Sequence, residues 1–240
     1  SSDHLVQDAY SLRCAPQVHG ATRDVLAFVS SVLEIEASSV SDNPIVLPDD
    51  GEVLSGGNFH GQPVAVALDA LAVATVGTAS VSERRLYRLL DPATSHGLPA
   101  FLVAESGVNS GFMLAQYTAA SLVSECKSIA HPASVDSIPS SAGQEDHVSM
   151  GMIAARHARD VVEAAEIVVA IEALTAAQAL DLRGPLQPAP GTRAARETVR
   201  SIAPFLDRDR ELGPEIDAAT RLVREGTLVQ GVEAEVGALE

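Results

Sequence analysis

Apolar residues recur at helical spacing along most of this chain, and turn-forming residues divide them into long stretches. Proline sets several boundaries, because the residue before a proline disfavours the helical conformation. Between the first two stretches, Asp50-Gly51 is a turn signal that predicts a small hairpin of residues 45–47 and 52–54. The pattern predicts long helices over residues 16–36, 63–91, 110–130 and from 144–147 to 182, and shorter helices over 192–202 and 214–224.

The predicted long helices exceed the usual three turns, so the expected architecture is an all-α bundle of long helices. Of the 240 residues, 46 % are hydrophobic but only 3 % are aromatic, and a core of small side chains suits closely packed helices. We expect residues 1–185 to form the central bundle and the more charged residues 186–240 to form a smaller C-terminal helical cap of the same domain. The helix that ends at residue 182 has an apolar face that needs long partners, some of them from other chains.

Charge and cysteine content exclude several classes of function. The net charge is −16 and Lys127 is the only lysine, so nucleic-acid backbones and anionic membranes repel the chain. Cys14 and Cys126 form no disulfide framework, which is typical of a reducing compartment. The most apolar run, residues 63–81, is interrupted by Asp69 and does not predict a membrane span. We expect a cytoplasmic protein that binds neither nucleic acid nor membrane.

Four loops rich in polar residues and glycine adjoin the predicted helices, at residues 7–13, 55–61, 109–112 and 131–147. In the first loop, Tyr10 and Arg13 share one face if the segment is helical, with Gln7 a turn earlier. A guanidinium binds a carboxylate through two parallel hydrogen bonds, and a nearby cation stabilises a phenolate base. This loop therefore indicates an amino-acid site, and a structural ion pair beside a buried tyrosine is the alternative.

The second and last loops offer further polar groups. In the second, glycines allow close backbone approach and Phe59 offers an apolar wall, although a tight turn before the next helix also explains the pattern. In the last, Glu145 lies at a predicted helix start, where a carboxylate either caps the helix or binds a polar substrate group. The remaining potential metal ligands lack compact spacing, so we expect no metal. Those ligands are His60, His131, Asp136, Glu145 and His147.

Taken together, these loops resemble, in order, motifs of the aromatic amino acid ammonia-lyase family. The matching stretches are residues 7–14, 56–61, 109–112 and 134–139, and the most specific is 144–151 (QEDHVSMG). The match covers nearly all of this chain but only about the second half of a typical member. The resemblance implies the all-α fold of the fumarase/aspartase-like superfamily and a homotetramer whose active sites draw on more than one subunit.

By correspondence with the family, Tyr10 is the general base at the substrate β-carbon, Arg13 binds the carboxylate, and Gln7 assists near the reacting centre. Phe59 lines the pocket, and Glu145 contacts the substrate ring or assists with protons. Phenylalanine-specific relatives carry an amide where Glu145 stands, so the resemblance implies elimination of ammonia from L-histidine to give trans-urocanate. A related tyrosine or phenylalanine ammonia-lyase or aminomutase is the alternative.

The family's cofactor is methylidene-imidazolone (MIO), an electrophile formed from an internal Ala-Ser-Gly, and no Ala-Ser-Gly occurs in this sequence. We therefore expect the N-terminal half of the same enzyme to be a partner that supplies MIO. We expect this chain alone to be inactive. A catalytically silent helical assembly subunit remains open as a different class of function.

Overall fold

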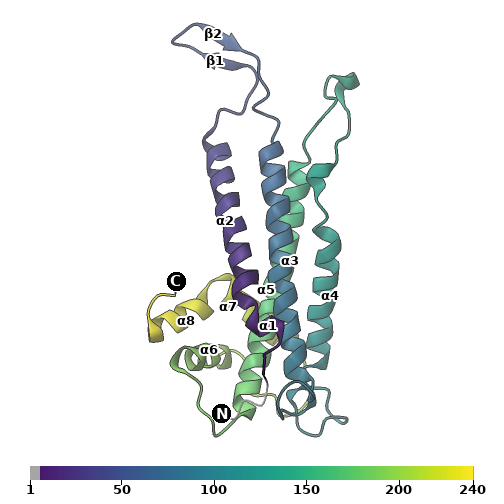
Figure 1. The fold of residues 1–240 in the computed structure, drawn as a ribbon, viewed down its shortest axis with the longest axis vertical. Helices are drawn as coiled ribbons and strands as arrows, with labels where there is room; N and C mark the ends of the chain where they lie inside the picture. Colours follow the sequence, from purple (N-terminus) through teal and green to yellow (C-terminus); the bar gives the residue numbers. More distant parts are fainter. Residues whose placement is uncertain (1–5, 240) are drawn as a thin grey trace. The chain divides into compact units, whose positions relative to one another are not determined.

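The computed structural model describes residues 6–239, and helices dominate this part of the chain (Figure 1). The all-α class expected from the sequence is confirmed. The helices are α1 (Tyr10–Arg13), α2 (Ala15–Ser38), α3 (Gln62–Leu90), α4 (Met113–Ile129), α5 (Gly151–Leu182), α6 (Pro190–Arg200), α7 (Gly213–Arg224) and α8 (Thr227–Val236). The strands are β1 (Ile45–Leu47) and β2 (Glu52–Leu54), and short 3-10 turns span Ala100–Leu102, Ala133–Val135 and Ser141–Gly143.

Most predicted boundaries are confirmed where a turn residue sets them. The strands β1 and β2 pair antiparallel around Asp50-Gly51, with Ile45 opposite Leu54, in the connection between α2 and α3 (Figure 1). Helix α3 ends before Pro92, and α4 ends before Pro132. The predicted start of α5 is wrong, because this helix begins at Gly151 and not within residues 144–147, and helix α8 was not expected.

The chain divides into two compact units. Unit 1 consists of the described residues within Ser1–Pro16, Thr78–Glu125 and Glu163–Glu240, and unit 2 consists of Gln17–Gly77 and Cys126–Val162. Each of the long helices α3, α4 and α5 contributes one part to unit 1 and the other part to unit 2.

Unit 1 contains the larger apolar core, built around the C-terminal part of α5. Ile171 and Leu174 pack there with Leu86, Leu102 and Leu206, and each such side chain stabilises the fold by about 1.5–3 kcal/mol when fully buried.

The polar side chain of Gln178 is fully buried beside this core. Its amide donates to the carbonyl oxygens of Leu102 and Leu206 at 3.0 and 2.9 Å and accepts from Leu206 N and Arg200 at 3.1 and 3.0 Å. All four hydrogen-bonding positions of the Gln178 amide are therefore used.

Unit 2 has a small core of alanines, in which Ala65, Ala133 and Ala154 pack with Met150 and Ile153.

Helix α3 is the one described helix long and apolar enough to cross a membrane. Length and composition alone do not make it a span, because core helices of water-soluble proteins meet the same criteria.

Candidate functional site

Helix α1 brings together the three side chains of the first loop. Arg13 Nη1 donates to Gln7 Oε1 at 2.5 Å, and the Arg13 guanidinium carbon lies 5.9 Å from the centre of the Tyr10 ring. The prediction that these residues share one face is confirmed. Tyr10 is 73 % exposed, which excludes the alternative of a buried tyrosine. The cluster presents a phenol and a guanidinium side by side, the pair that a carboxylate-binding site with a base requires.

A partly buried ion pair contacts the backbone of α1. Glu172 of α5 pairs with the Arg85 guanidinium, with Nη2 and Oε2 2.8 Å apart, and accepts a hydrogen bond from Ser82 at 2.5 Å. Arg85 Nη1 also reaches the Ser11 carbonyl oxygen at 3.4 Å. Ser11 itself is buried, whereas its neighbours Tyr10 and Leu12 are exposed. The sequence does not indicate this pair, because the two residues lie 87 positions apart and no local pattern connects them.

In unit 2, Phe59 precedes α3 in a turn and is 57 % exposed. Asn58 Nδ2 donates to the Val40 carbonyl oxygen at 3.3 Å, which anchors this turn to the end of α2. The next residues of the turn bond to residues 147–149, through the contact of His60 Nε2 with the His147 carbonyl oxygen at 3.1 Å. The loop that carries Phe59 is thus joined directly to the loop that carries Glu145.

Glu145 does not lie at a helix start, so its interpretation as an N-terminal cap is wrong. It forms an antiparallel bridge with Ser140, in which Ser140 N donates to Glu145 O at 3.0 Å and Glu145 N donates to Ser140 O at 3.3 Å. The Ser140 hydroxyl also donates to the Glu145 carboxylate. Hydrogen bonds from Ser140 and then Ser141 lower the pKa of Glu145 below its usual 4.5. Glu145 is therefore an exposed carboxylate that stays ionised at neutral pH.

The third predicted loop is bound within the protein. The backbone N–H groups of Ser110 and Gly111 donate to the Asp209 carboxylate at 2.8–2.9 Å, and α4 begins only at Met113. The helix predicted to begin at residue 110 therefore begins later than expected. Asp209, which follows 98 residues after Gly111, was not identified as a partner from the sequence.

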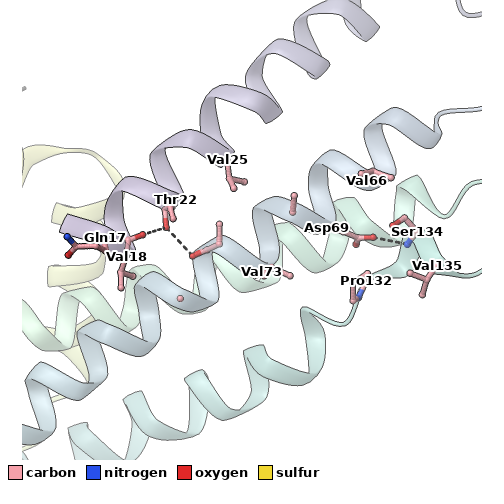
Figure 2. Close-up of a pocket in the computed structure, with 14 residues that line it drawn as sticks. Gln17, Val18, Thr22, Val25, Val66, Asp69, Val73, Pro132, Ser134 and Val135 are labelled. Carbon is pink, nitrogen blue, oxygen red and sulfur yellow. Dashed lines mark hydrogen bonds between the residues drawn. The ribbon is translucent and has the colours of Figure 1, made fainter. Parts of the chain in front are cut away.

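A groove of about 820 Å³ runs between α2, α3 and residues 132–135 of unit 2 (Figure 2). Val18, Val25, Val66 and Val73 make its walls apolar, and none of the candidate site residues lines it. Its carboxylate, Asp69, is 5 % exposed and is occupied by backbone hydrogen bonds. The groove is therefore not lined by the candidate chemistry.

Among residues 6–239, no group of three or more His, Cys, Asp or Glu side chains is arranged to hold a metal ion.

The candidate site residues are divided between the two compact units. Gln7, Tyr10 and Arg13 belong to unit 1, and Phe59 and Glu145 belong to unit 2.

A model of the aromatic amino acid lyase family matches residues 1–201. The chain belongs to this family. Its similar relatives include the histidine ammonia-lyase of Anaeromyxobacter dehalogenans, 60 % identical over 94 % of this chain and 44 % of that protein. The histidine ammonia-lyase of Natranaerobius thermophilus is 55 % identical over 98 % of this chain and 46 % of that protein. The chain thus spans less than half the length of these relatives.

Two solved lyase-family structures have the same fold. The crystal structure of histidine ammonia-lyase from Trypanosoma cruzi superposes with a TM-score of 0.91 at 49 % identity, over 96 % of this chain and 46 % of that one. Tyrosine aminomutase from Streptomyces globisporus superposes with a TM-score of 0.93 at 40 % identity, over 98 % and 45 %. Fold similarity therefore does not separate the two activities named for these proteins.

Aromatic amino acid lyases use the MIO group, and each unit of this chain offers an exposed aromatic residue that suits the surroundings of such a group. Tyr10 and Phe59 expose most of their rings, so both offer uncovered aromatic surface for a neighbouring cofactor or substrate. The sequence contains no Ala-Ser-Gly from which the group itself is formed.

Proposed function

We propose that this chain contributes to the active site of a histidine ammonia-lyase, which eliminates ammonia from L-histidine to give trans-urocanate. The observation that carries the proposal is the 55–60 % identity with histidine ammonia-lyases over nearly the whole of this chain. The exposed cluster of Gln7, Tyr10 and Arg13 and the ionised Glu145 support it.

The elimination removes a proton from the substrate β-carbon, breaks the bond between the α-carbon and the amine, and leaves a carbon–carbon double bond. Arg13 binds the carboxylate through paired hydrogen bonds, with Gln7 fixing the guanidinium. The Tyr10 oxygen accepts the β-proton as general base. When bound, MIO supplies the electrophile that activates the substrate.

Glu145 distinguishes an imidazole from a phenyl ring. An imidazole donates a hydrogen bond or carries a positive charge, and an ionised carboxylate stabilises both forms. A phenyl ring offers neither, so it leaves the carboxylate without a partner. Phe59 contacts the flat face of the ring. A tyrosine aminomutase is the second candidate, supported by the TM-score of 0.93 to that enzyme.

The proposal includes partners. The N-terminal half of the same enzyme carries the Ala-Ser-Gly that forms MIO, and the whole assembles as a homotetramer in the cytoplasm. Two observations support the partner half and the assembly: the chain spans 44–46 % of its relatives, and valines in the groove of unit 2 are exposed, with Val66 at 44 % and Val73 at 54 %. Such uncovered apolar surface favours association.

The test combines this chain with an N-terminal half from a relative and follows the ultraviolet absorbance of urocanate. We expect activity with L-histidine from the assembly and none from this chain alone. Tyr10→Phe should reduce kcat by about 10²- to 10⁴-fold through loss of the base. Tyr117→Phe, at a tyrosine that is 64 % exposed, is the matched control and should leave activity unchanged.

Substrate profiles of the same assembly separate the two candidates. Glu145→Gln should raise the KM for L-histidine and leave weak turnover of L-phenylalanine or L-tyrosine unchanged or improved. Urocanate formation by this chain alone would contradict the need for a partner. An assembly that prefers L-tyrosine would replace the histidine assignment.

A further inference from the structure

Two histidines join the loops of unit 2 that carry Phe59 and Glu145. The rings of His60 and His147 stack with their centres 5.4 Å apart and their planes 18° from parallel. His60 Nε2 lies 3.1 Å from the His147 carbonyl oxygen and 3.3 Å from His147 Nδ1. One ring nitrogen of His60 therefore contacts both the backbone and the side chain of His147.

These contacts fix the tautomers of both rings. A carbonyl oxygen only accepts hydrogen bonds, so His60 Nε2 must carry the proton. His147 Nδ1 then faces an N–H donor and must present its lone pair. The ring-to-ring contact therefore needs the lone pair of His147 Nδ1, which a carbon atom at that position cannot supply.

Further hydrogen bonds close the same junction. The Ser149 hydroxyl donates to the His60 carbonyl oxygen at 2.5 Å. Gly61 has a φ of +75°, and a Cβ there would lie 3.3 Å from Ser149 Oγ, so the two segments approach closely. Val148 N donates to Ser137 Oγ at 2.9 Å, which ties the junction to the segment that precedes Glu145. The junction thus restrains the chain on both sides of Glu145.

We propose that His60 and His147 are positioning residues that hold the Glu145 carboxylate in place relative to the Phe59 ring. This inference rests on the proposed function. His60 directly follows Phe59, and His147 lies two residues after Glu145, so a contact between them couples the side chains assigned to the substrate ring. Neither histidine is assigned to the reacting atoms. Their role is to limit the displacement of Glu145, and a displacement of about 1 Å can reduce activity by about 10²-fold.

The experiment uses the assembled enzyme, with this chain and its N-terminal half, and compares two variants at one position. His60→Leu removes the donor, whereas His60→Gln places an amide N–H near the same point. We expect His60→Leu to raise the KM for L-histidine by about 10- to 100-fold with a smaller change in kcat, and His60→Gln to restore most of the loss. His131→Leu, at an exposed histidine of unit 2, is the control and should keep the wild-type KM.

A double-mutant cycle distinguishes positioning from folding. If His60 acts through Glu145, the effect of His60→Leu should shrink to about twofold or less in a Glu145→Gln background. If His60→Leu raises the KM equally in the Glu145→Gln background, the inference is overturned. It is also overturned if the wild-type assembly is active and its His60→Leu variant keeps the wild-type KM. A wild-type assembly that forms no urocanate overturns the proposed function and, with it, this role. Nitrogen-15 spectra that place a proton on His147 Nδ1 overturn the contact itself, whatever the activity.

Discussion

The buried carboxylate of Asp69 offers a direct test of how the last of the four loops is held. Asp69 Oδ1 accepts from Ala133 N at 3.1 Å. Its Oδ2 accepts from Ser134 N at 2.7 Å (Figure 2). Both donors belong to the turn that follows Pro132 and leads toward Glu145. Asp69→Asn keeps the size of the side chain but leaves only one acceptor, so one N–H faces an amide NH₂ group.

The expected loss of stability in Asp69→Asn follows from the hydrogen bonds that the substitution removes. A hydrogen bond to a charged acceptor contributes about 1.5–3 kcal/mol, and a buried N–H without a partner costs about 1–3 kcal/mol. Asparagine needs less desolvation than a carboxylate, which offsets part of this loss. The net decrease in the free energy of unfolding should be about 2–3 kcal/mol. The midpoint of urea unfolding should then fall by about 0.7–3 M, since m is about 1–3 kcal/mol/M.

Urea unfolding followed by circular dichroism measures the global effect, and amide hydrogen exchange locates it. Protection of the Ala133 and Ser134 amides should fall by about 30- to 150-fold, which is the same free energy expressed as a ratio. Asp24→Asn, on an exposed face of α2, is the matched control and should change stability by less than about 0.5 kcal/mol. An unchanged urea midpoint with both amides still protected would refute the assignment of Asp69 as the anchor of this loop.

Three further substitutions test other features. Ser140→Ala should raise the pKa of Glu145 toward 4.5 in a carbon-13 NMR titration, because a donor to the carboxylate is lost. The wild-type carboxylate should protonate only below pH 4.5. Equal titration midpoints in the wild type and the variant would contradict this. Gly111→Ala should cost more than about 2 kcal/mol in thermal unfolding, because φ is +53° and the new Cβ would lie 2.4 Å from the Phe101 carbonyl oxygen. Gln178→Leu should cost about 3–5 kcal/mol in urea unfolding, because four partner atoms lose their bonds; a loss below about 1 kcal/mol would count against it.

The sequence predicted helix ends well where a single residue determines them. Proline disfavours helix at the preceding residue, so Pro92 and Pro132 indicated where α3 and α4 end. Asp50-Gly51 predicted the existence of the hairpin, and the structure adds its register, with Leu47 opposite Glu52. These signals act within a few residues, so one sequence is sufficient to read them.

The start of α5 could not be predicted in this way. Residues 144–150 have a sequence that continues the helical pattern, yet they stay outside the helix. Glu145 pairs with Ser140, and His147 and Ser149 bond to the loop at residue 60, which precedes them by almost ninety residues. Tertiary hydrogen bonds outweigh the local preference here, because each such bond contributes more than the few tenths of a kcal/mol that separate ordinary helix propensities.

In the candidate site, too, the features set by neighbouring residues were predicted, and the contacts between residues far apart in the sequence were not. The sequence identified Tyr10, Arg13 and Glu145 from short motifs, and it predicted that Tyr10 and Arg13 share a face, because three residues of spacing determine that. It did not identify what holds them. The ion pair that contacts α1 and the histidine contact beside Glu145 each join residues 87 positions apart. The side chains proposed to contact the substrate are thus readable from local pattern, whereas the residues that fix their geometry become visible only when the chain is folded.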